Sequence, residues 1–358
     1  MKNEYPKYFL GANSCEGFVS HFGECFDFRD GWRGIIIKGG PGTGKSSFMK
    51  KIAAKISEHG YDVQLCPCSS DPKSLDAVII KDKKVALMDG TAPHVVEPVY
   101  PGACEEIVNL GEFWNGRILR KNASEIIDVT DINKGLHKTA SGYIAAAGEL
   151  IYDNLKLSLT YTDIAAAEIF GKGVAKKCVP KKTNCTPHEW IRFIGGISPE
   201  GIVAYTDTVS KFYGNVIVID DKYGAAANAI MQSVRKTALS RGYEIITLKS
   251  PFLPSKLIDH ILIPELSLAF VTENEYIKFG DNYRRIHARR FADVEKMHAL
   301  RGRMLFNRRV ARELLREAIK TLSRAKAVHD RIESYYIDAM DFDAVNLLAD
   351  KLAEDILK

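Results

Sequence analysis

The residues with the clearest chemical pattern are eight in a row: Gly39, Gly40, Pro41, Gly42, Thr43, Gly44, Lys45 and Ser46. They match G-x-x-x-x-G-K-[ST] at every fixed position. Glycines in this order let the backbone curl so that successive N–H groups point inward at phosphate oxygens. A helix that starts near Lys45 adds the positive end of its dipole. We therefore expect this loop, with Ser47 behind it, to bind the phosphates of a nucleotide.

Two side chains of the loop have specific roles in such a site. Lys45 is expected to reach the β- and γ-phosphates, and the Ser46 hydroxyl to ligate Mg²⁺. An acid at the end of a neighbouring strand is also needed to hold the metal through water. The apolar run 85–88 ends in Asp89, and one further strand, over 61–66, separates it from the loop. We assign Asp89 to the metal together with Ser46.

Four segments extend the pattern beyond the loop: Phe9-Leu10-Gly11, residues 39–46, Asp89-Gly90-Thr91-Ala92-Pro93-His94, and Gly111-Glu112-Phe113-Trp114. With them, over both halves, the chain resembles an uncharacterised bacterial family of duplicated (tandem) P-loop ATPases. The resemblance implies binding of ATP and Mg²⁺ and hydrolysis of the nucleotide. GTP is disfavoured because the string nearest to a guanine-reading Asn-Lys-x-Asp, residues 133–136, ends in leucine.

The chain also repeats itself. Residues 9–19 (FLGANSCEGFV) reappear in the second half as residues 193–203 (FIGGISPEGIV). Three further matches have nearly the same spacing, among them the Gly-Tyr pairs at 60–61 and 242–243. The repeat predicts two domains. We place them at residues 1–182, with the intact loop, and residues 188–358, on either side of a polar, proline-containing linker.

Both halves have the same order of expected elements. A hairpin (8–20, 191–206) precedes a strand (34–38, 215–219) and a helix (45–58, 226–240). A strand (61–66, 243–248), a short helix, an apolar strand (84–89, 267–272) and a long helical region follow. This alternation predicts an α/β fold of two tandem P-loop NTPase-like domains. Each would have a parallel sheet flanked by helices and a C-terminal helical segment.

The second half lacks the residues that phosphate binding needs. Aligning the strands puts Asp220 opposite Gly39, and it puts Ala225, Ala226 and Ala227 opposite Gly44, Lys45 and Ser46. Thr272 takes the place of Asp89. Asp220 and Asp221 would then lie where phosphate oxygens belong, and two carboxylates repel a polyanion. We expect a pseudo-site that does not bind Mg-nucleotide.

A segment at roughly 90–105 belongs only to the half with the intact loop. With Trp114 aligned to Tyr283, the stretch from Asp89 to Trp114 is more than twice as long as the stretch from Thr272 to Tyr283. A long loop beside a metal-binding strand is usually functional. The candidates there for orienting the attacking water are His94, Glu97, Glu105 and Glu106. A solvated surface insertion is the alternative interpretation.

Residues 281–331 are strongly basic. They contain 15 Lys/Arg and 6 Asp/Glu, a net charge of +9 against +5 for the whole chain. Three interpretations stay open. The helices of this segment could present an ordinary solvated face, bind nucleic acid or a protein partner, or deliver an arginine to the ATP of the other half.

Composition excludes several classes of protein. With 358 residues, 46% hydrophobic and 27% charged, the chain is close to the globular average. No apolar run approaches the ~18 residues of a membrane span. The N-terminus lacks the apolar centre of a signal peptide, and seven cysteines is an odd number. We expect a cytoplasmic protein without a membrane partner.

The leading prediction is a Mg-dependent ATPase with one active N-terminal nucleotide site and a C-terminal pseudo-site. A small-molecule or nucleotide kinase would share the same loop but would need an acceptor pocket. An ATP-gated module that binds nucleic acid or protein is the third class. The oligomeric state does not follow from the sequence.

Overall fold

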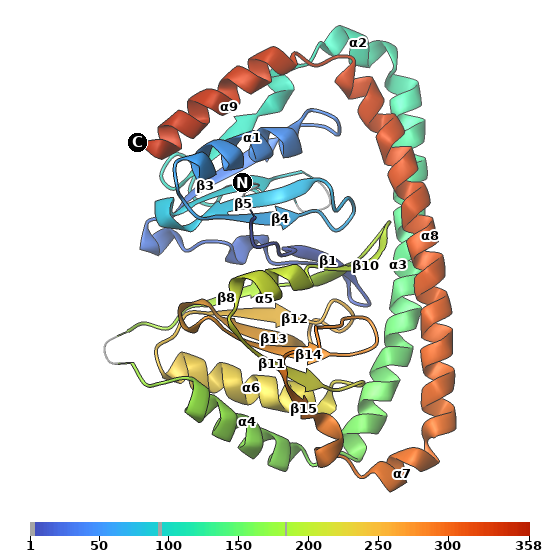
Figure 1. Ribbon diagram of the computed structural model, residues 1–358. Helices are drawn as coiled ribbons and strands as arrows, with labels where there is room; N and C mark the ends of the chain where they lie inside the picture. The colour runs from blue at the N-terminus through green and yellow to red at the C-terminus, as the bar shows by residue number, and fades with distance from the viewer. Residues whose placement is uncertain (1–3, 92–94, 183–184) are drawn as a thin grey trace.

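The computed structural model describes residues 4–91, 95–182 and 185–358. The chain forms two lobes, each built on a sheet, and two long helices run side by side along both lobes (Figure 1). Within the described residues, no helix combines the length and the apolar character that crossing a membrane requires.

The N-terminal sheet is mixed. Its strands lie in the order β4 (Val63–Pro67), β5 (Leu75–Ile80), β6 (Val85–Asp89), β3 (Arg33–Lys38) and β7 (Glu105–Asn109). β3 is parallel to β6 and β7, whereas β5 is antiparallel to both of its neighbours. The prediction of a parallel sheet was therefore wrong. The segment before residue 84, for which only a short helix was expected, contains strand β5, followed by a short 3₁₀ helix (Lys81–Lys83). All six residues of β5 are buried, as in a strand covered on both faces.

The C-terminal sheet repeats this arrangement. Its order is β15 (Arg284–His287), β11 (Asn215–Asp220), β14 (Leu268–Glu273), β13 (Ile258–Ile263), β12 (Ile245–Lys249) and β8 (Glu189–Arg192). β11 is parallel to β14 and β15, and β13 is antiparallel to β12 and β14. The elements β3, β5, β6 and β7 of the first half thus correspond to β11, β13, β14 and β15.

Two hairpins join the lobes. They are β1–β2 (Gly11–Ser14, Gly17–Ser20) and β9–β10 (Gly195–Ser198, Gly201–Ala204), which confirms the hairpins expected from the repeat. Phe9 and Phe193, each fully buried, exchange backbone hydrogen bonds of 2.8 and 2.9 Å. The repeated motif therefore lies where the two halves meet.

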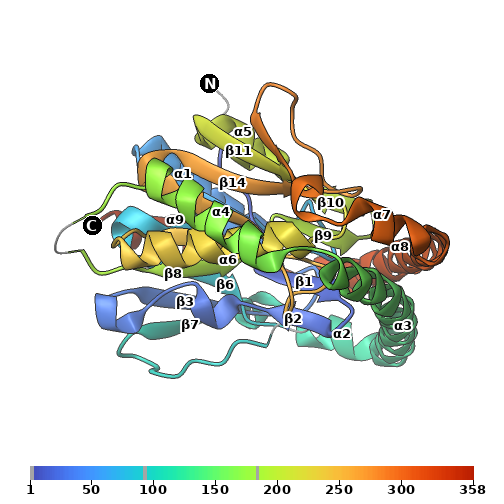
Figure 2. The ribbon, with the colours of Figure 1, turned by 90° about the horizontal axis from the view of Figure 1, so that it is seen from below.

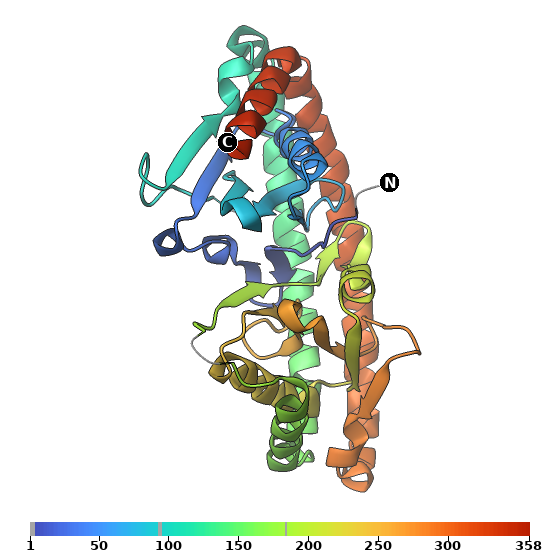
Figure 3. The same cartoon turned by 60° about the vertical axis from the view of Figure 1, so that its left-hand side comes forward.

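The two central helices follow the central strands, and each is covered by a helix from the other half. α1 (Lys45–Glu58) packs against α9 (Phe342–Leu357), with Val345 and Ala349 in the N-terminal core. α6 (Ala225–Ser240) packs against α4 (Ile164–Cys178), with Val174 in the C-terminal core. Figures 1 and 3 show α9 beside α1, and Figure 2 shows α4 beside α6. The division at residues 182–188 stays a prediction, and these two helices pack across it.

Two long helices, α3 (Ala123–Thr160) and α8 (Arg301–Ile337), carry the chain from each lobe to the other. They run in opposite directions along both lobes. The facing residues Ala140 and Ala147 of α3 and Ala311 and Ala318 of α8 are buried and small, so the helices approach closely. The shorter helices are α2 (Gly116–Lys121), α5 (Thr206–Phe212) and α7 (Val294–Ala299). The long helical region expected at the end of each half is confirmed, but it covers the opposite lobe.

Candidate functional site

The glycine-rich loop, residues 39–46, connects buried strand β3 to helix α1. Gly42 (φ 71°) and Gly44 (φ 85°) have left-handed backbone conformations, which glycine adopts without strain. Gly44 is the N-cap of α1, and the Thr43 hydroxyl donates to the carbonyl of Gly40 at 2.8 Å. The amino end of α1 therefore opens directly onto the loop, as the motif predicted, and helix α1 has the predicted bounds.

Lys45 lies folded across the loop. Its Nζ donates to the carbonyl oxygens of Gly39 at 3.0 Å and Gly40 at 2.8 Å. The same Nζ is 3.7 Å from Oδ2 of Asp89, which ends strand β6. β6 pairs directly with β3, with Asp89 opposite Ile37, while β4 forms the edge of the sheet. The structure thus brings together Lys45 and Asp89, the two charges predicted for the site.

Asp89 is fixed by the residues that follow it. The backbone N–H and the hydroxyl of Thr91 donate to Oδ1 at 2.9 and 2.5 Å, which leaves Oδ2 facing Lys45. Burial raises the pKa of Asp89, although the Lys45 ammonium and the Thr91 hydrogen bonds act in the opposite direction. A divalent cation at this position would favour the ionised carboxylate.

Ser46 and Ser47 differ in their surroundings. The Ser46 hydroxyl accepts a hydrogen bond of 2.9 Å from the backbone N–H of Leu75, the first residue of β5. A hydroxyl that accepts one bond keeps a second lone pair, so Ser46 can still ligate a metal. Ser47 is exposed on α1.

Sequence reasoning missed a second acid at this site, Asp76. It is 3% exposed and follows Leu75 in β5. Ala77 is paired with Met88, so the antiparallel register places Asp76 beside Asp89. The charge of Asp76 contributes to the raised pKa of Asp89. The available signal was an acid in the otherwise apolar run 75–80, which we had interpreted as a short helix.

The acids predicted after Asp89 have different positions. Glu97 lies 2.6 Å from Nζ of Lys38, the last residue of β3, and so stays at the loop end of that strand. Glu105 is buried and accepts from the N–H groups of Val99 and Tyr100, an arrangement that holds the segment in place.

Glu106 forms an ion pair with Arg33 at the opposite end of β3, and Glu105 is paired with Gly34 at that end. Neither Glu105 nor Glu106 is brought to the glycine-rich loop. His94 lies outside the described residues.

The extra segment is shorter than the sequence alignment indicated. Ile37 is paired with Asp89 and Val108, and Ile219 is paired with Thr272 and Ile286. Eighteen residues lie between the first pair and thirteen between the second, so the N-terminal half is longer by five residues. The alignment of Trp114 with Tyr283 was wrong because it overlooked strands β7 and β15.

The loop is covered by residues of the second half, at the α8–α9 corner (residues 333–342). A Cβ added at Gly42 would lie 2.5 Å from the backbone oxygen of Glu333. A Cβ at Gly40 would lie 2.7 Å from the ring of Tyr336. Glycine at positions 40 and 42 therefore allows the α8–α9 corner to lie close to the loop. At Gly42 it also allows the left-handed backbone conformation.

Eight of the 15 lysine and arginine side chains in the basic segment form ion pairs with acids among the described residues. Glu275 contacts both Arg308 and Arg312, Asp153 contacts Arg303, and Glu313 contacts Arg316. The α8 side chain that forms an ion pair with the loop before β5 is Lys326, 3.3 Å from Asp71. These contacts favour the interpretation of 281–331 as a structural helix surface over a free cationic surface.

The loop of the second half is two residues shorter. Five residues separate β3 from the helix-capping Gly44, and three separate β11 from Gly224, which caps α6 with φ 82°. Ala225 and Ala226 therefore take the places of Lys45 and Ser46. The sequence alignment was wrong by one position here, because it did not allow for the shorter loop.

Asp221 fills the anion position of this shorter loop. Its carboxylate accepts hydrogen bonds from the backbone N–H groups of Tyr223 (3.1 Å), Gly224 (3.0 Å) and Ala227 (2.9 Å). Amino ends of helices commonly bind anions. Asp221 thus lies at the amino end of α6. Asp220 instead points to solvent and lies 3.1 Å from His287.

No family model, curated protein or solved structure matches this chain. Its chemistry is therefore inferred from its own residues. The N-terminal lobe combines a helix end, a lysine, a serine hydroxyl, the partly buried Asp89 and the buried Asp76. Such a set can hold a metal-bound polyphosphate. The C-terminal lobe has an internal carboxylate at the equivalent helix end.

Two neighbouring buried groups in the C-terminal lobe have shifted pKa values of opposite sense. Burial lowers the pKa of His260 to about 3, and Nδ1 of His260 accepts a 3.0 Å hydrogen bond from the N–H of Thr272, which requires the neutral ring. Burial raises the pKa of Asp259 to about 7.

We expect these shifts to oppose each other in the pH dependence of stability. Below about pH 6.5 the unfolded chain protonates His260 and the folded one does not, so this term lowers the free energy of unfolding as the pH falls. Asp259 is protonated only in the folded chain between about pH 4 and 7, so its term lowers stability as the pH rises. In His260→Asn only the contribution of Asp259 remains. The free energy of unfolding of this variant should therefore fall by about 1 kcal/mol per pH unit as the pH rises from 4.5 to 6.5.

Urea unfolding across that pH range measures this slope. The matched variant Asp259→Asn should give a slope of the opposite sign. Identical pH profiles for both variants and the wild type would contradict the expectation.

Proposed function

We propose that the N-terminal lobe binds Mg-ATP through residues 39–47 and hydrolyses it, as one half of a tandem P-loop NTPase-like protein. The observation that carries this proposal is the loop itself. It joins a buried strand to a helix end, and Lys45 Nζ lies 3.7 Å from the carboxylate of Asp89 on the adjacent strand. This is the placement of lysine, helix dipole and acid that a metal-bound triphosphate requires.

Each residue has a role in this proposal. Lys45 exchanges its loop carbonyls for phosphate oxygens and neutralises their charge, while Ser46 and Asp89 hold Mg²⁺. Asp76, buried beside Asp89, and Glu97, at the carboxyl end of β3, are the acids that can orient a water molecule. Catalysis of this type is mostly positioning and electrostatic stabilisation.

The C-terminal lobe is not expected to bind Mg-ATP. Asp221 uses its carboxylate to pair with the amides that would hold a phosphate. Ala225 and Thr272 replace the lysine and the acid. A triphosphate brought to this loop would meet the Asp221 carboxylate at the helix end, where the N-terminal lobe has Lys45 and this lobe has an alanine.

A nucleotide-gated switch is a second candidate function, and one contact favours it. The backbone of Glu333 and the ring of Tyr336 lie against the glycine-rich loop. Phosphates that settle into the loop would change its contacts with α8, a helix that continues to the other lobe. Order or displacement of such an element is a common switching device.

Calorimetric titration with Mg-ATP tests the proposal. We expect one ATP per chain, with binding that weakens when EDTA removes the metal. Phosphate release without an added acceptor would support hydrolysis, whereas transfer only to a supplied acceptor would assign the site to a kinase. Absence of binding, or two ATP molecules per chain, would contradict the assignment.

A further inference from the structure

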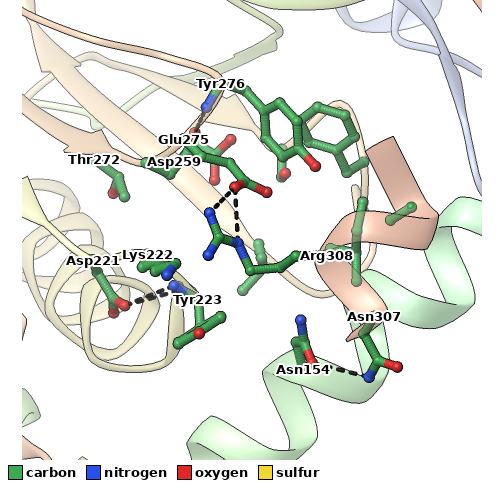
Figure 4. Close-up of a pocket in the computed structure, with 17 residues that line it drawn as sticks. Asn154, Asp221, Lys222, Tyr223, Asp259, Thr272, Glu275, Tyr276, Asn307 and Arg308 are labelled. Atoms are coloured by element: carbon green, nitrogen blue, oxygen red, sulfur yellow. Dashed lines mark hydrogen bonds and ion pairs between the residues drawn. The ribbon is translucent and has the colours of Figure 1, made fainter. Parts of the chain in front are cut away.

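A cavity lies in the C-terminal lobe, at the position where the N-terminal lobe has its glycine-rich loop. It is bounded by the loop 221–224, by Asp259 and Thr272 at the ends of β13 and β14, and by α3 and α8. Figure 4 shows Arg308 reaching from α8 to Glu275 across this cavity. Its volume is about 60 Å³.

Three residues that line the cavity have a buried polar atom without a hydrogen-bond partner among the described residues: Asp259 (Oδ2), Thr272 (Oγ1) and Tyr276 (the hydroxyl). Asp259 is 6% and Thr272 3% exposed. His260 is paired with Val271 in the antiparallel ladder, so Asp259 and Thr272 are neighbours across it. A buried carboxylate oxygen and a buried hydroxyl that lack a partner are unfavourable, because each has lost its hydrogen bonds to water without a replacement. A hydrogen-bonding ligand would remove that cost.

The oxygens of Asp259 and Thr272 are suited to an ammonium group. A carboxylate and a hydroxyl both accept hydrogen bonds from –NH₃⁺, which has three donors. The rings of Phe252 and Tyr276, whose centroids are 4.6 Å apart, line the same cavity. Aromatic faces also attract organic cations.

Positively charged side chains lie at the rim of the cavity, in contrast to the two oxygen acceptors of Asp259 and Thr272. Arg308 and Lys222 line it, and Arg312 shares the carboxylate of Glu275 with Arg308. Asp221 also lines the cavity, but its carboxylate is already bonded to three backbone N–H groups, so these three cations share the carboxylate of Glu275. Burial, and next the charge of Arg308, lower the pKa of Lys222, as expected where positive charge is crowded. An anionic group at the rim would relieve this repulsion.

The size of the cavity excludes large ligands. One water molecule needs about 10–15 Å³ of such space, so the cavity holds a ligand of roughly four to six heavy atoms. Asp221 already occupies the helix end that would take a phosphate. A nucleotide is therefore disfavoured by both volume and charge.

We propose that this cavity binds a small zwitterionic amino acid, with its ammonium group at Asp259 and Thr272 and its carboxylate at Arg308 and Lys222. Glycine and β-alanine are the smallest amino acids that carry both charges. The site does not depend on ATP binding in the other lobe.

Calorimetric titration of the full chain with glycine and with β-alanine tests the proposal. We expect saturable binding of one molecule per chain by at least one of them, and none by methylamine or acetate, which carry a single charge. The ammonium would displace the proton of Asp259, so the binding enthalpy at pH 7 should change with the ionisation enthalpy of the buffer.

Two variants localise the site. Thr272→Val keeps the shape of the side chain and should weaken binding about tenfold, as expected for one lost hydrogen bond to a charged group. The control Thr237→Val changes a buried threonine on α6 whose hydroxyl bonds to Ser233, and should not affect binding. Lys45→Ala should also bind the amino acid with wild-type affinity. This variant therefore distinguishes a failure of the amino-acid site from a failure of the ATP site.

Absence of binding by both amino acids at 10-millimolar concentration would overturn the proposal, as would equal affinity in Thr272→Val and the wild type. Equal binding of acetate alone would assign the cavity to a simple anion and would also overturn it.

Discussion

Lys45→Ala is expected to lower the rate of ATP hydrolysis by about 10²–10³-fold, the usual loss when one preorganised charge or donor is removed from a transition state. The ammonium of Lys45 now rests on two loop carbonyls and faces Asp89. In the proposed complex Lys45 would exchange these contacts for phosphate oxygens and neutralise part of the negative charge that develops there. Phosphate release under saturating Mg-ATP measures the loss.

Two comparisons make this result specific. Lys172→Ala, which removes an exposed lysine on α4, should leave turnover unchanged. Asp76→Asn should retain ATP binding and lose turnover, since it removes an acid beside the metal position but no phosphate contact. If Lys45→Ala hydrolyses ATP at the wild-type rate, the glycine-rich loop is not the catalytic site.

Gly42→Ala is expected to disrupt the packing of the two halves as well as the loop. A side chain at φ 71° costs about 1–2 kcal/mol. The new Cβ would also lie 2.5 Å from the backbone oxygen of Glu333, which cannot rotate away. Overpacking of this kind costs about 1–3 kcal/mol more. We expect a loss of about 3 kcal/mol in the free energy of unfolding, together with loss of ATP binding.

Gly60→Ala is a matched control for Gly42→Ala. Gly60 has a similar left-handed φ of 86°, but nothing lies within 4 Å of an added Cβ. Gly60→Ala should lower the free energy of unfolding only by the strain of a side chain in a left-handed backbone conformation, about 1–2 kcal/mol. It should preserve ATP binding. Equal destabilisation by the two substitutions in urea unfolding would show that the contact with Glu333 contributes nothing.

The parts of the site that could be predicted from sequence are those encoded locally. Helix α1 and strand β3 were placed within one residue because glycines, a lysine and an apolar run mark them in consecutive positions. Asp89 was found for the same reason, since it ends an apolar strand. The two hairpins were predicted from the internal repeat. The same repeat predicted that the loop of the second half lacks the lysine and the serine of the glycine-rich loop.

What could not be predicted depends on distant parts of the chain. Asp76 belongs to the site only because β5 turns back beside β6, and a buried acid in an apolar run does not by itself reveal its neighbour. Glu105 and Glu106 were assigned to the wrong end of β3 because strand β7 was not recognised. The contact of Glu333 with Gly42 joins segments near opposite ends of the chain, and no pattern in either segment points to the other.

The crossing of α4 and α9 between the lobes affects how the protein can be made. The apolar side of α1 stays open until α9, at residues 342–357, has emerged from the ribosome. At about 5–20 residues per second, that is a delay of roughly 15 to 60 s after α1 is synthesised. During this interval the nascent chain exposes an uncovered apolar groove, so a premature stop codon near residue 340 should give an aggregation-prone product that depends on chaperones.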